Sequence, residues 1–278
     1  MNTAEQLDSL RATLDQWRLQ RQSIAFVPTM GNLHDGHLAL VNEARQQADR
    51  VVASIFVNPA QFGPGEDFES YPRTREADLA ALESVGCDLV WMPAVSRMYP
   101  LDPPFRIQVP DRLADRLCGA SRPGHFDGVA SVVLRLFNQV RPDLAVFGEK
   151  DYQQLLIIRR MVEDLALTVK IHGLPTVREA DGLAKSSRNG YLTDRERASA
   201  PVLYRVLGEM AEALRDGAEF KPLRAAALEN LEAAGFRPDY LEWCSAENLA
   251  EPRPEQPSRL FVAAWLGKAR LIDNLPLD

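Results

Sequence analysis

Two histidines, His34 and His37, lie in the glycine-containing segment Met30–His37, between an apolar stretch and residues with helical spacing. Glycines let a ligand approach the backbone closely, and free N–H groups at a helix N-terminus attract anions. Two imidazoles at such a turn favour phosphate binding over the simpler alternative, in which one histidine caps the helix and the other packs. Zinc binding is disfavoured, because the chain has 4 histidines and no third ligand at a suitable spacing.

The segment Gly148–Gln154 is a second candidate for phosphate binding and also follows an apolar stretch. Lys150 can reach phosphate oxygens as a point charge, and Asp151 can cap the following helix or orient a ligand hydroxyl. The alternative is a solvated charge cluster at a helix N-terminus. This segment alone does not decide between the two.

A polar loop, Asp181–Asn189, contains two adjacent serines flanked by cations. The hydroxyls of Ser186 and Ser187 can bind triphosphate oxygens. The flanking Lys185 and Arg188 can neutralise charge that builds on a leaving pyrophosphate. The alternative is a flexible loop between domains, because glycine, serine and asparagine are ordinary loop residues. A position at a cleft between domains favours the functional interpretation.

Two further segments, Val57–Phe62 and Arg122–Phe126, contain polar side chains that suit ligand binding. The neutral amide of Gln61 can recognise hydroxyl and carboxylate groups without a net charge, whereas Arg122 and His125 suit anions. In the alternative, the proline of the first segment ends a strand and its phenylalanine packs in the core. Spacing alone leaves both interpretations open.

Apolar stretches alternate with helical repeats along the first part of the chain. The clearest helix has apolar residues at i, i+3, i+4, i+7, i+8 and i+11 from Val129 to Val140. This alternation predicts an α/β fold with a parallel, doubly wound sheet, and ligands at the carboxyl ends of its strands. The predicted strands are 24–29, 51–57, 88–92, 144–147 and one around residue 169, and the predicted helices are 38–48, 75–85, 129–140 and 152–164.

The pattern changes after about Pro175, where the polar loop begins. A long helix over 203–214 follows, and then come short apolar stretches that predict strands at 240–243, 260–265 and 269–272. We therefore expect a catalytic domain over 1–176 and a smaller α+β domain over 177–278.

The composition is that of an ordinary globular protein, with 46% hydrophobic and 26% charged residues in a chain of 278. The net charge of -7 disfavours a nucleic-acid-binding surface, so anions must be bound by local basic groups. The 3 cysteines are too far apart for a disulfide framework or a zinc site, which fits a reducing cytoplasm. No segment approaches about eighteen uninterrupted apolar residues, so we expect neither secretion nor a membrane span.

In combination, five segments of the chain resemble the pantothenate synthetase family of pantoate–β-alanine ligases, in the same order and over nearly the whole length. The HxGH pattern alone is shared by many nucleotidylyltransferase-like proteins, whereas the other four segments are far more specific together. The segments are PTMGNLHDGH at Pro28–His37, FVNPAQF at Phe56–Phe62, RPGHFDGV at Arg122–Val129, FGEKDYQQ at Phe147–Gln154 and LAKSSRN at Leu183–Asn189.

This resemblance implies a Rossmann-like catalytic domain of the nucleotidylyltransferase type, a small C-terminal domain that acts as a lid, and a homodimer. The implied reaction condenses pantoate with β-alanine at the expense of ATP and gives pantothenate, AMP and pyrophosphate. Pantoate first attacks the α-phosphorus to form a pantoyl adenylate, and the β-alanine amine then displaces AMP. Neither step needs a covalent enzyme nucleophile, so we expect positioning and charge stabilisation to supply the catalysis.

The resemblance also implies roles for single residues. His34 and His37 would contact the ATP phosphates and the transition-state charge, with Lys150 and Arg188 also acting in catalysis. The amides of Gln61 and Gln154 would bind the hydroxyl and carboxylate oxygens of pantoate. Mg²⁺ would be bound mainly by the triphosphate, with few direct protein ligands and no dedicated metal site. The nucleotide-binding set is Met30, His34, His37, Gly148, Lys150, Asp151, Val177, Lys185, Ser186, Ser187 and Arg188.

One position departs from the pattern, because the family commonly has methionine where this chain has Lys185. The Lys-Ser pair is similar to the signature by which some aminoacyl-tRNA synthetases hold a triphosphate, so the added charge could favour departure of pyrophosphate. The alternative is a side chain that extends into solvent without a function, as most loop lysines do.

Two rival functions are compatible with the HxGH turn. A nucleotidylyltransferase would transfer AMP or CMP to a phosphate, and a nucleotide sensor would bind without turnover. The neutral amides of Gln61 and Gln154 favour a small carboxylate substrate, since a phosphorylated acceptor should require a second basic cluster.

Overall fold

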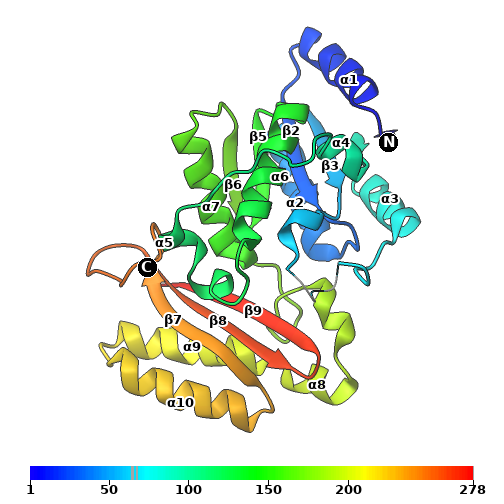
Figure 1. Cartoon of the computed structure of the whole chain (residues 1–278). Coiled ribbons are helices and arrows are strands. Elements are labelled where there is room, and N and C mark those ends of the chain that lie inside the picture. The colour runs from blue at the N-terminus through cyan, green and yellow to red at the C-terminus, as the bar shows by residue number, and fades with distance from the viewer. Residues whose placement is uncertain (64–65, 67, 278) are drawn as a thin grey trace.

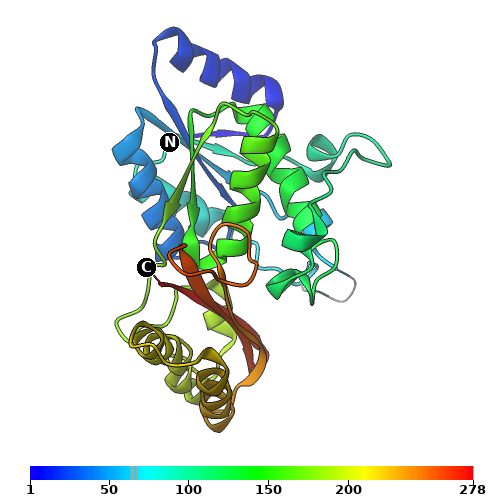
Figure 2. The same cartoon turned by 90° about the vertical axis from the view of Figure 1, so that its left-hand side faces the viewer.

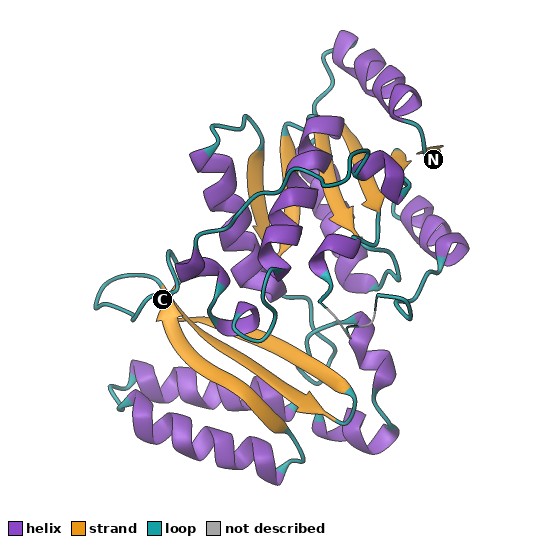
Figure 3. Ribbon diagram, in the orientation of Figure 1, coloured by secondary structure: helices purple, strands orange, loops and turns teal. Residues whose placement is uncertain are grey.

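The computed structural model describes residues 1–63, 66 and 68–277, and this part of the chain forms two sheets with flanking helices (Figures 1 and 3). The strands are β1 Asn2–Ala4, β2 Ile24–Thr29, β3 Arg50–Ile55, β4 Leu89–Trp91, β5 Leu144–Gly148, β6 Lys170–Leu174, β7 Arg237–Ser245, β8 Ser258–Leu266 and β9 Ala269–Leu277. The α-helices are α1 Leu7–Leu19, α2 Asp35–Gln47, α3 Arg75–Ser84, α4 Val95–Met98, α5 Asp111–Ala114, α6 His125–Val140, α7 Tyr152–Asp164, α8 Asp194–Ser199, α9 Val202–Arg215 and α10 Phe220–Ala233. Short 3₁₀ turns are η1 Pro59–Gln61, η2 Leu117–Gly119, η3 Glu149–Asp151 and η4 Ser187–Tyr191.

The larger sheet is parallel and has helices on both faces. Within the described residues its strand order is β1-β4-β3-β2-β5-β6. Successive side chains of a strand point to opposite faces, so Phe26 of β2 packs among residues of α1, α6 and α7, whereas Val27 packs among residues of α2 and α3. The predicted doubly wound α/β fold is confirmed.

The strand order reverses between β2 and β5, which are neighbouring strands inside this sheet. In the described chain only two residue pairs join them, both in the first half of each strand. The Thr29 carbonyl accepts a hydrogen bond from the Phe56 N–H on the β3 side. Because backbone groups alternate along a strand, Pro28 faces β5, where it has no N–H to donate. The carboxyl ends of β2 and β5 are therefore not paired with each other, at the switch point where doubly wound sheets bind ligands.

The smaller sheet is antiparallel, with the strand order β7-β8-β9, and it lies between the α9–α10 pair and the parallel-sheet half of the molecule (Figures 1 and 2). On one face, Leu260 and Val262 of β8 pack in a cluster with residues of α9 and α10. On the other face, the Phe261 ring lies 6.0 Å from the ring of Tyr152 in α7, measured between centroids. Both faces of β8 are thus buried, which explains its nearly continuous apolar sequence.

Most of the predicted elements are confirmed, and β2 and α7 have the predicted bounds. The sequence prediction missed β1, an edge strand of 3 residues, and the alanine-rich α10. It also missed α1 and the short helices α4, α5 and α8. It also ended β9 too early, at residue 272 instead of Leu277. Two buried polar residues, Asp273 and Asn274, interrupt the apolar pattern of that strand.

Candidate active site

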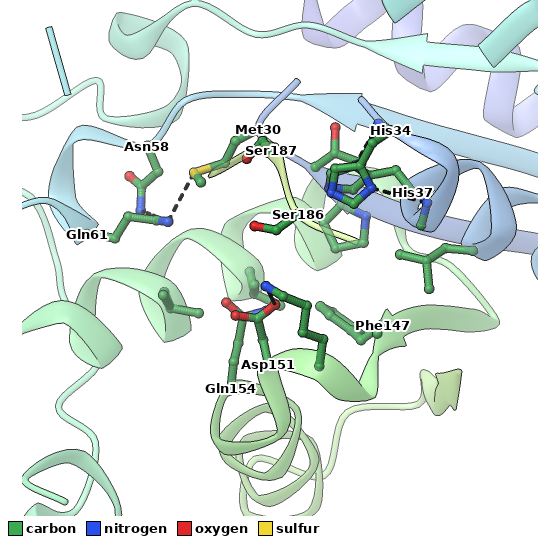
Figure 4. Close-up of a pocket in the computed structure, with 18 of the residues that line it drawn as sticks. Met30, His34, His37, Asn58, Gln61, Phe147, Asp151, Gln154, Ser186 and Ser187 are labelled. Atoms are coloured by element: carbon green, nitrogen blue, oxygen red, sulfur yellow. Dashed lines mark hydrogen bonds and ion pairs between the residues drawn. The ribbon is translucent and has the colours of Figure 1, made fainter. Parts of the chain in front are cut away.

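A cavity of about 260 Å³ lies at the carboxyl ends of β2 and β5, where the two strands separate (Figure 4). A larger cavity of about 960 Å³ lies beside it and extends to β9, and Lys150, Gln154 and Arg188 line both. The first cavity brings together every residue that the sequence predicts for ATP or pantoate. These are Met30, His34, His37, Gln61, Gly148, Lys150, Asp151, Gln154, Val177, Lys185, Ser186, Ser187 and Arg188.

The two histidines form the N-terminal cap of α2. Nδ1 of His34 accepts a hydrogen bond from the Gly36 N–H at 3.1 Å, and Nδ1 of His37 accepts one from the His34 N–H at 3.3 Å. Their ring centroids are 4.1 Å apart. A Cβ at position 36 would lie 2.8 Å from Cε1 of His34, so this position requires glycine. Both imidazoles cap the helix through Nδ1, which leaves both Nε2 atoms for a ligand.

Both imidazoles are neutral at pH 7. Burial lowers the pKa of His34 to about 4 and that of His37 to about 3, and the charge of Lys150 contributes to both shifts. Because each Nδ1 accepts a backbone N–H, the single ring proton of each neutral imidazole is on Nε2. The site therefore offers two uncharged N–H donors, which suit phosphate oxygens whose negative charge increases during a reaction.

The loop that precedes α2 is held in place by Asp78 of α3, a carboxylate that is only 2% exposed. Its Oδ1 accepts a hydrogen bond from the Leu33 N–H at 2.8 Å, and its Oδ2 accepts one from the Asn32 N–H at 3.0 Å. Gly31 has φ +81°, and a Cβ there would lie 2.9 Å from Oδ2 of Asp78. Asp78 thus fixes the path of the loop that leads to the histidines, a role that the sequence did not predict.

Lys150 enters the cavity from η3, between β5 and α7. Its side chain is largely buried, and its Nζ lies 4.0 Å from Oδ2 of Asp151. Figure 4 shows Asp151 and Gln154 on the side of the cavity opposite the two imidazoles. Within the described chain the Gln154 amide has no hydrogen-bond partner. The turn therefore brings a cation and an available amide to one side of the cavity.

The segment Val177–Tyr191 closes a third side of the cavity. The Lys185 N–H donates to the Val177 carbonyl at 2.9 Å, which closes a small hairpin. Just after it, the Ser186 hydroxyl accepts a hydrogen bond from the Arg188 N–H at 3.3 Å and caps η4. The hairpin and the cap hold the predicted serines and cations against the cavity.

Lys185 joins this segment to the start of α2. Its Nζ lies 2.6 Å from Oδ2 of Asp35 and 3.1 Å from Oε2 of Glu179. These carboxylates raise the pKa of Lys185, and the lysine in turn lowers the pKa of Asp35. The side chain therefore does not extend freely into solvent. The effect of its charge on the departure of pyrophosphate stays a prediction.

Asn58 fixes the orientation of the Gln61 amide, and sequence reasoning did not identify it as a functional residue. Asn58 is 1% exposed, and its Nδ2 donates to Oε1 of Gln61 and to the Gly128 carbonyl, both at 3.1 Å. The Tyr99 hydroxyl donates to Oδ1 of Asn58 at 2.6 Å. The carbonyl oxygen of the Gln61 amide is therefore occupied, and its N–H₂ group, 3.1 Å from the Met30 sulfur, is the group that can bind a ligand.

Arg122 and His125 contact the backbone of η1, the turn that contains Gln61. Nη1 of Arg122 lies 3.0 Å from Nε2 of His125, and Nδ1 of His125 lies 2.7 Å from the backbone carbonyl oxygen of Gln61. Since arginine only donates, Nε2 accepts and Nδ1 donates to the carbonyl. Burial and the Arg122 charge lower the pKa of His125 to about 4, so it is neutral. Glu66 pairs with Arg122 at 2.6 Å, so these residues form a charge-balanced support for Gln61.

The remaining side of the cavity is apolar. Several of its side chains come from one face of α6. The apolar stripe of this helix predicted the helix itself, but not its contact with the cavity. Beside the amides of Gln61 and Gln154, this surface fits a small molecule with both apolar carbons and several oxygens. The apolar lining residues include Val129, Val132, Val133, Leu136 and Phe147.

A doubly wound sheet with a phosphate-binding turn at its switch point, next to an amide-lined subsite, defines an α/β protein that binds a nucleotide and a small oxygen-rich substrate. Sequence comparison identifies the particular family, since the profile of the pantoate-beta-alanine ligases matches residues 2–276. The chain belongs to the pantoate-beta-alanine ligase family.

Known relatives match over the whole chain. The pantothenate synthetase of Pseudomonas fluorescens strain Pf-5 is 56% identical, with 100% of this chain and 98% of the relative covered. That of Shewanella oneidensis is 52% identical, with 100% of both covered. A crystal structure of pantothenate synthetase from Thermus thermophilus has a TM-score of 0.91 at 50% identity and covers 99% of each chain. The enzyme from Francisella tularensis, solved in complex with β-γ ATP and β-alanine, has a TM-score of 0.82 at 34% identity and covers 99% of this chain and 97% of that chain.

Proposed function

We propose that this protein condenses pantoate with β-alanine in an ATP-dependent reaction that passes through pantoyl adenylate and releases AMP and pyrophosphate. The observation that carries this proposal is the position of two neutral amides, Gln61 and Gln154, in the same cavity as the imidazole donors and the phosphate-binding cations. Family membership and the β-γ ATP and β-alanine complex of the Francisella tularensis relative support the same reaction.

Pantoate has a carboxylate, two hydroxyls and a carbon with two methyl groups, and the subsite offers a partner for each kind of group. The N–H₂ group of Gln61, oriented by Asn58, and the amide of Gln154 bind its oxygens. The valine face of α6 packs against the methyl groups. Because the amides carry no charge, the carboxylate stays nucleophilic instead of being held by a salt bridge.

In the first step a carboxylate oxygen of pantoate attacks the α-phosphorus, and the bond from that phosphorus to the pyrophosphate oxygen breaks. Lys150, Ser186 and Arg188 bind the phosphates, and their charge and donors stabilise the departing pyrophosphate. The neutral Nε2–H groups of His34 and His37 bind more strongly as charge accumulates on the phosphate oxygens, which favours the transition state over bound ATP.

In the second step the β-alanine amine attacks the carbonyl carbon of the adenylate, the bond to AMP breaks, and the amine proton leaves to water. The larger cavity gives β-alanine a path to this carbon, because Gln154 lines both cavities. The reaction needs no covalent link to the protein. Its catalysis is the alignment of reacting atoms and the stabilisation of charge.

The residues of this site fit a Mg²⁺ ion that is bound mainly by the triphosphate. The described residues that line the first cavity include several cations and a single carboxylate, Asp151, so the phosphate oxygens and Asp151 would hold the ion. When bound, Mg²⁺ neutralises phosphate charge and makes the α-phosphorus more electrophilic.

The organisation of the molecule in the cell forms part of the same proposal. Residues 177–278 act as a lid on a catalytic domain over 1–176, two chains form a homodimer, and the protein works in the cytoplasm. Three free cysteines agree with a reducing compartment. No helix in the described ranges is long and apolar enough to cross a membrane.

Pyrophosphate release separates this function from the two rivals. We expect release from ATP only when pantoate is present, followed by AMP formation when β-alanine is added. A nucleotidylyltransferase would require a phosphorylated acceptor, and a nucleotide sensor would bind ATP without releasing pyrophosphate. Arg122, the cation beside Gln61, is already paired with Glu66, so the structure favours the carboxylate substrate over a phosphorylated one.

A further inference from the structure

Two consecutive residues of β9, Asp273 and Asn274, are polar and almost completely buried, with 4% and 2% of their surface exposed. Buried polar side chains of this kind are stable only when they are hydrogen-bonded, so their partners show what they hold. Strand β9 packs against both η3 and η4, the turns that contain or adjoin the phosphate-binding residues. Neither residue lies in a segment that the sequence had singled out.

Asn274 holds the turn that contains Lys150. Its Nδ2 donates to the carbonyl of Glu149 at 2.8 Å and to that of Lys150 at 2.9 Å, so both amide hydrogens are used. Its Oδ1 accepts a hydrogen bond from Arg259, whose guanidinium also bonds Oε2 of Glu149 at 2.9 Å. The same guanidinium lies 3.9 Å from the ring of Tyr152. The second sheet thus fixes both the backbone and a side chain of η3.

Asp273 holds the hairpin that leads to Ser186 and Arg188. Its two carboxylate oxygens accept hydrogen bonds from Arg178 at 2.6 and 3.0 Å, in a bidentate pair. Nη1 of Arg178 also donates to the Gly182 carbonyl at 3.1 Å, at the far end of the hairpin. Bidentate arginine–carboxylate pairs fix geometry as well as distance.

We propose that Asp273 and Asn274 are positioning residues that set the spacing between the two phosphate-binding segments, η3 with Lys150 and the hairpin with Ser186 and Arg188. This inference rests on the proposed adenylation. The two segments are far apart in sequence. A bound triphosphate requires the distance between them to be held to a tolerance of about 0.5 Å. Asp273 and Asn274 are neighbours in one strand, and each holds one of the two segments. The position of β9 therefore sets the distance between the two groups of phosphate-binding residues.

A double-mutant cycle tests the proposal. Asn274→Ala is made in the wild-type chain and in a Lys150→Ala chain, and ATP affinity and single-turnover pyrophosphate release are measured in each. We expect Asn274→Ala to weaken both by roughly tenfold or more in the wild-type chain, because misplacement by about 1 Å can reduce rates about 10²-fold. In the Lys150→Ala chain the same substitution should change them by less than about twofold.

A purely structural role predicts a different pattern. Equal losses in both chains, or an ATP affinity and release rate that Asn274→Ala leaves unchanged, would overturn the proposal. Ser258→Ala is the matched control, because Ser258 is a buried polar residue of the same sheet that bonds Trp243 and Leu277 instead of the phosphate-binding segments. It should lower the melting temperature and leave ATP affinity unchanged. Pantoate affinity should stay within about twofold in every variant.

Asp273→Asn is the second variant, should Asn274→Ala fail to fold. It keeps the size of the side chain but breaks one half of the bidentate pair, and the proposal predicts weaker ATP binding with unchanged pantoate binding. Failure of the proposed function has a separate signature. A wild-type protein that releases no pyrophosphate with pantoate, while Asn274→Ala still weakens ATP, would refute the reaction and support the positioning role.

Discussion

His37 contributes two separable interactions, and each can be removed without the other. Its Nδ1 accepts the backbone N–H of His34 at 3.3 Å, and its Nε2–H is the donor that faces the cavity. The carbonyl oxygen of asparagine occupies nearly the place of Nδ1, and the amide nitrogen of glutamine nearly that of Nε2. His37→Asn therefore keeps the cap and loses the cavity donor, whereas His37→Gln keeps the donor and loses the cap.

The expected magnitudes follow from the two contacts. Loss of a preorganised donor to a developing oxyanion lowers the rate about 10²-fold, or about 2.7 kcal/mol in the activation free energy. Loss of a long, neutral capping bond costs about 0.5–1 kcal/mol in the free energy of unfolding. We expect His37→Asn to slow adenylation about 10²-fold with near wild-type stability, and His37→Gln to be less stable but clearly more active.

Single-turnover formation of labelled pyrophosphate from ATP and pantoate measures the first effect, and denaturant unfolding measures the second. A His37→Asn variant that adenylates at nearly the wild-type rate would refute the role given to Nε2. Equal rates in the two variants would mean that the helix cap alone matters. His37→Ala, which removes both contacts, should show the sum of the two defects.

Further predictions concern the amides, Lys185 and pH. Gln61→Ala should weaken pantoate binding by about 0.5–1.5 kcal/mol and leave ATP binding unchanged in separate titrations. Asn58→Ala should also weaken pantoate binding, because it frees the Gln61 amide to rotate. Lys185→Met should raise the apparent KM for ATP by no more than about fivefold, because ion pairs with solvent-exposed carboxylates such as Asp35 are weak. It should not change β-alanine capture of preformed adenylate. A larger effect on the KM for ATP would point to direct contact of Lys185 with the phosphates. The pKa values of His34 and His37, about 4 and about 3, lie below the ordinary 6.5, so the unfolded chain takes up protons first and the free energy of unfolding falls as the pH drops from 6.5 toward 4. Denaturant unfolding across that range should show a smaller fall for His37→Asn than for the wild-type chain, and an equal fall would contradict the burial of a neutral imidazole.

The residues that line the cavity could be predicted from the sequence because each lies in a short local pattern. His34 and His37 follow a strand and begin a helix, and Lys150 occupies the equivalent place after β5. Parallel strands place such turns at the same edge of the sheet, so the proximity of these segments follows from the alternation of elements. The periodicity of α6 likewise predicted the helix, although not that its valines line the cavity.

The residues that hold the cavity residues in place could not be predicted in this way. Asp78 bonds backbone N–H groups of a loop that comes far earlier in the chain, and Asn274 bonds carbonyls of a turn more distant still. Nothing in the sequence near either residue indicates these partners, because the contacts exist only after the sheets have formed and packed. One of the two partners of Lys185 is equally non-local, since Asp35 lies at the start of α2.

The proposed reaction bonds a carboxylate oxygen of pantoate to the α-phosphorus of ATP within this cavity. Pantoate labelled with ¹⁸O at both carboxylate oxygens tests whether this bond forms, in a full reaction with ATP and β-alanine followed by mass analysis of the products. We expect AMP to acquire one labelled oxygen from each pantoate, while the other remains in the amide of pantothenate. Unlabelled AMP, or release of ADP with the label in inorganic phosphate, would contradict the proposed reaction.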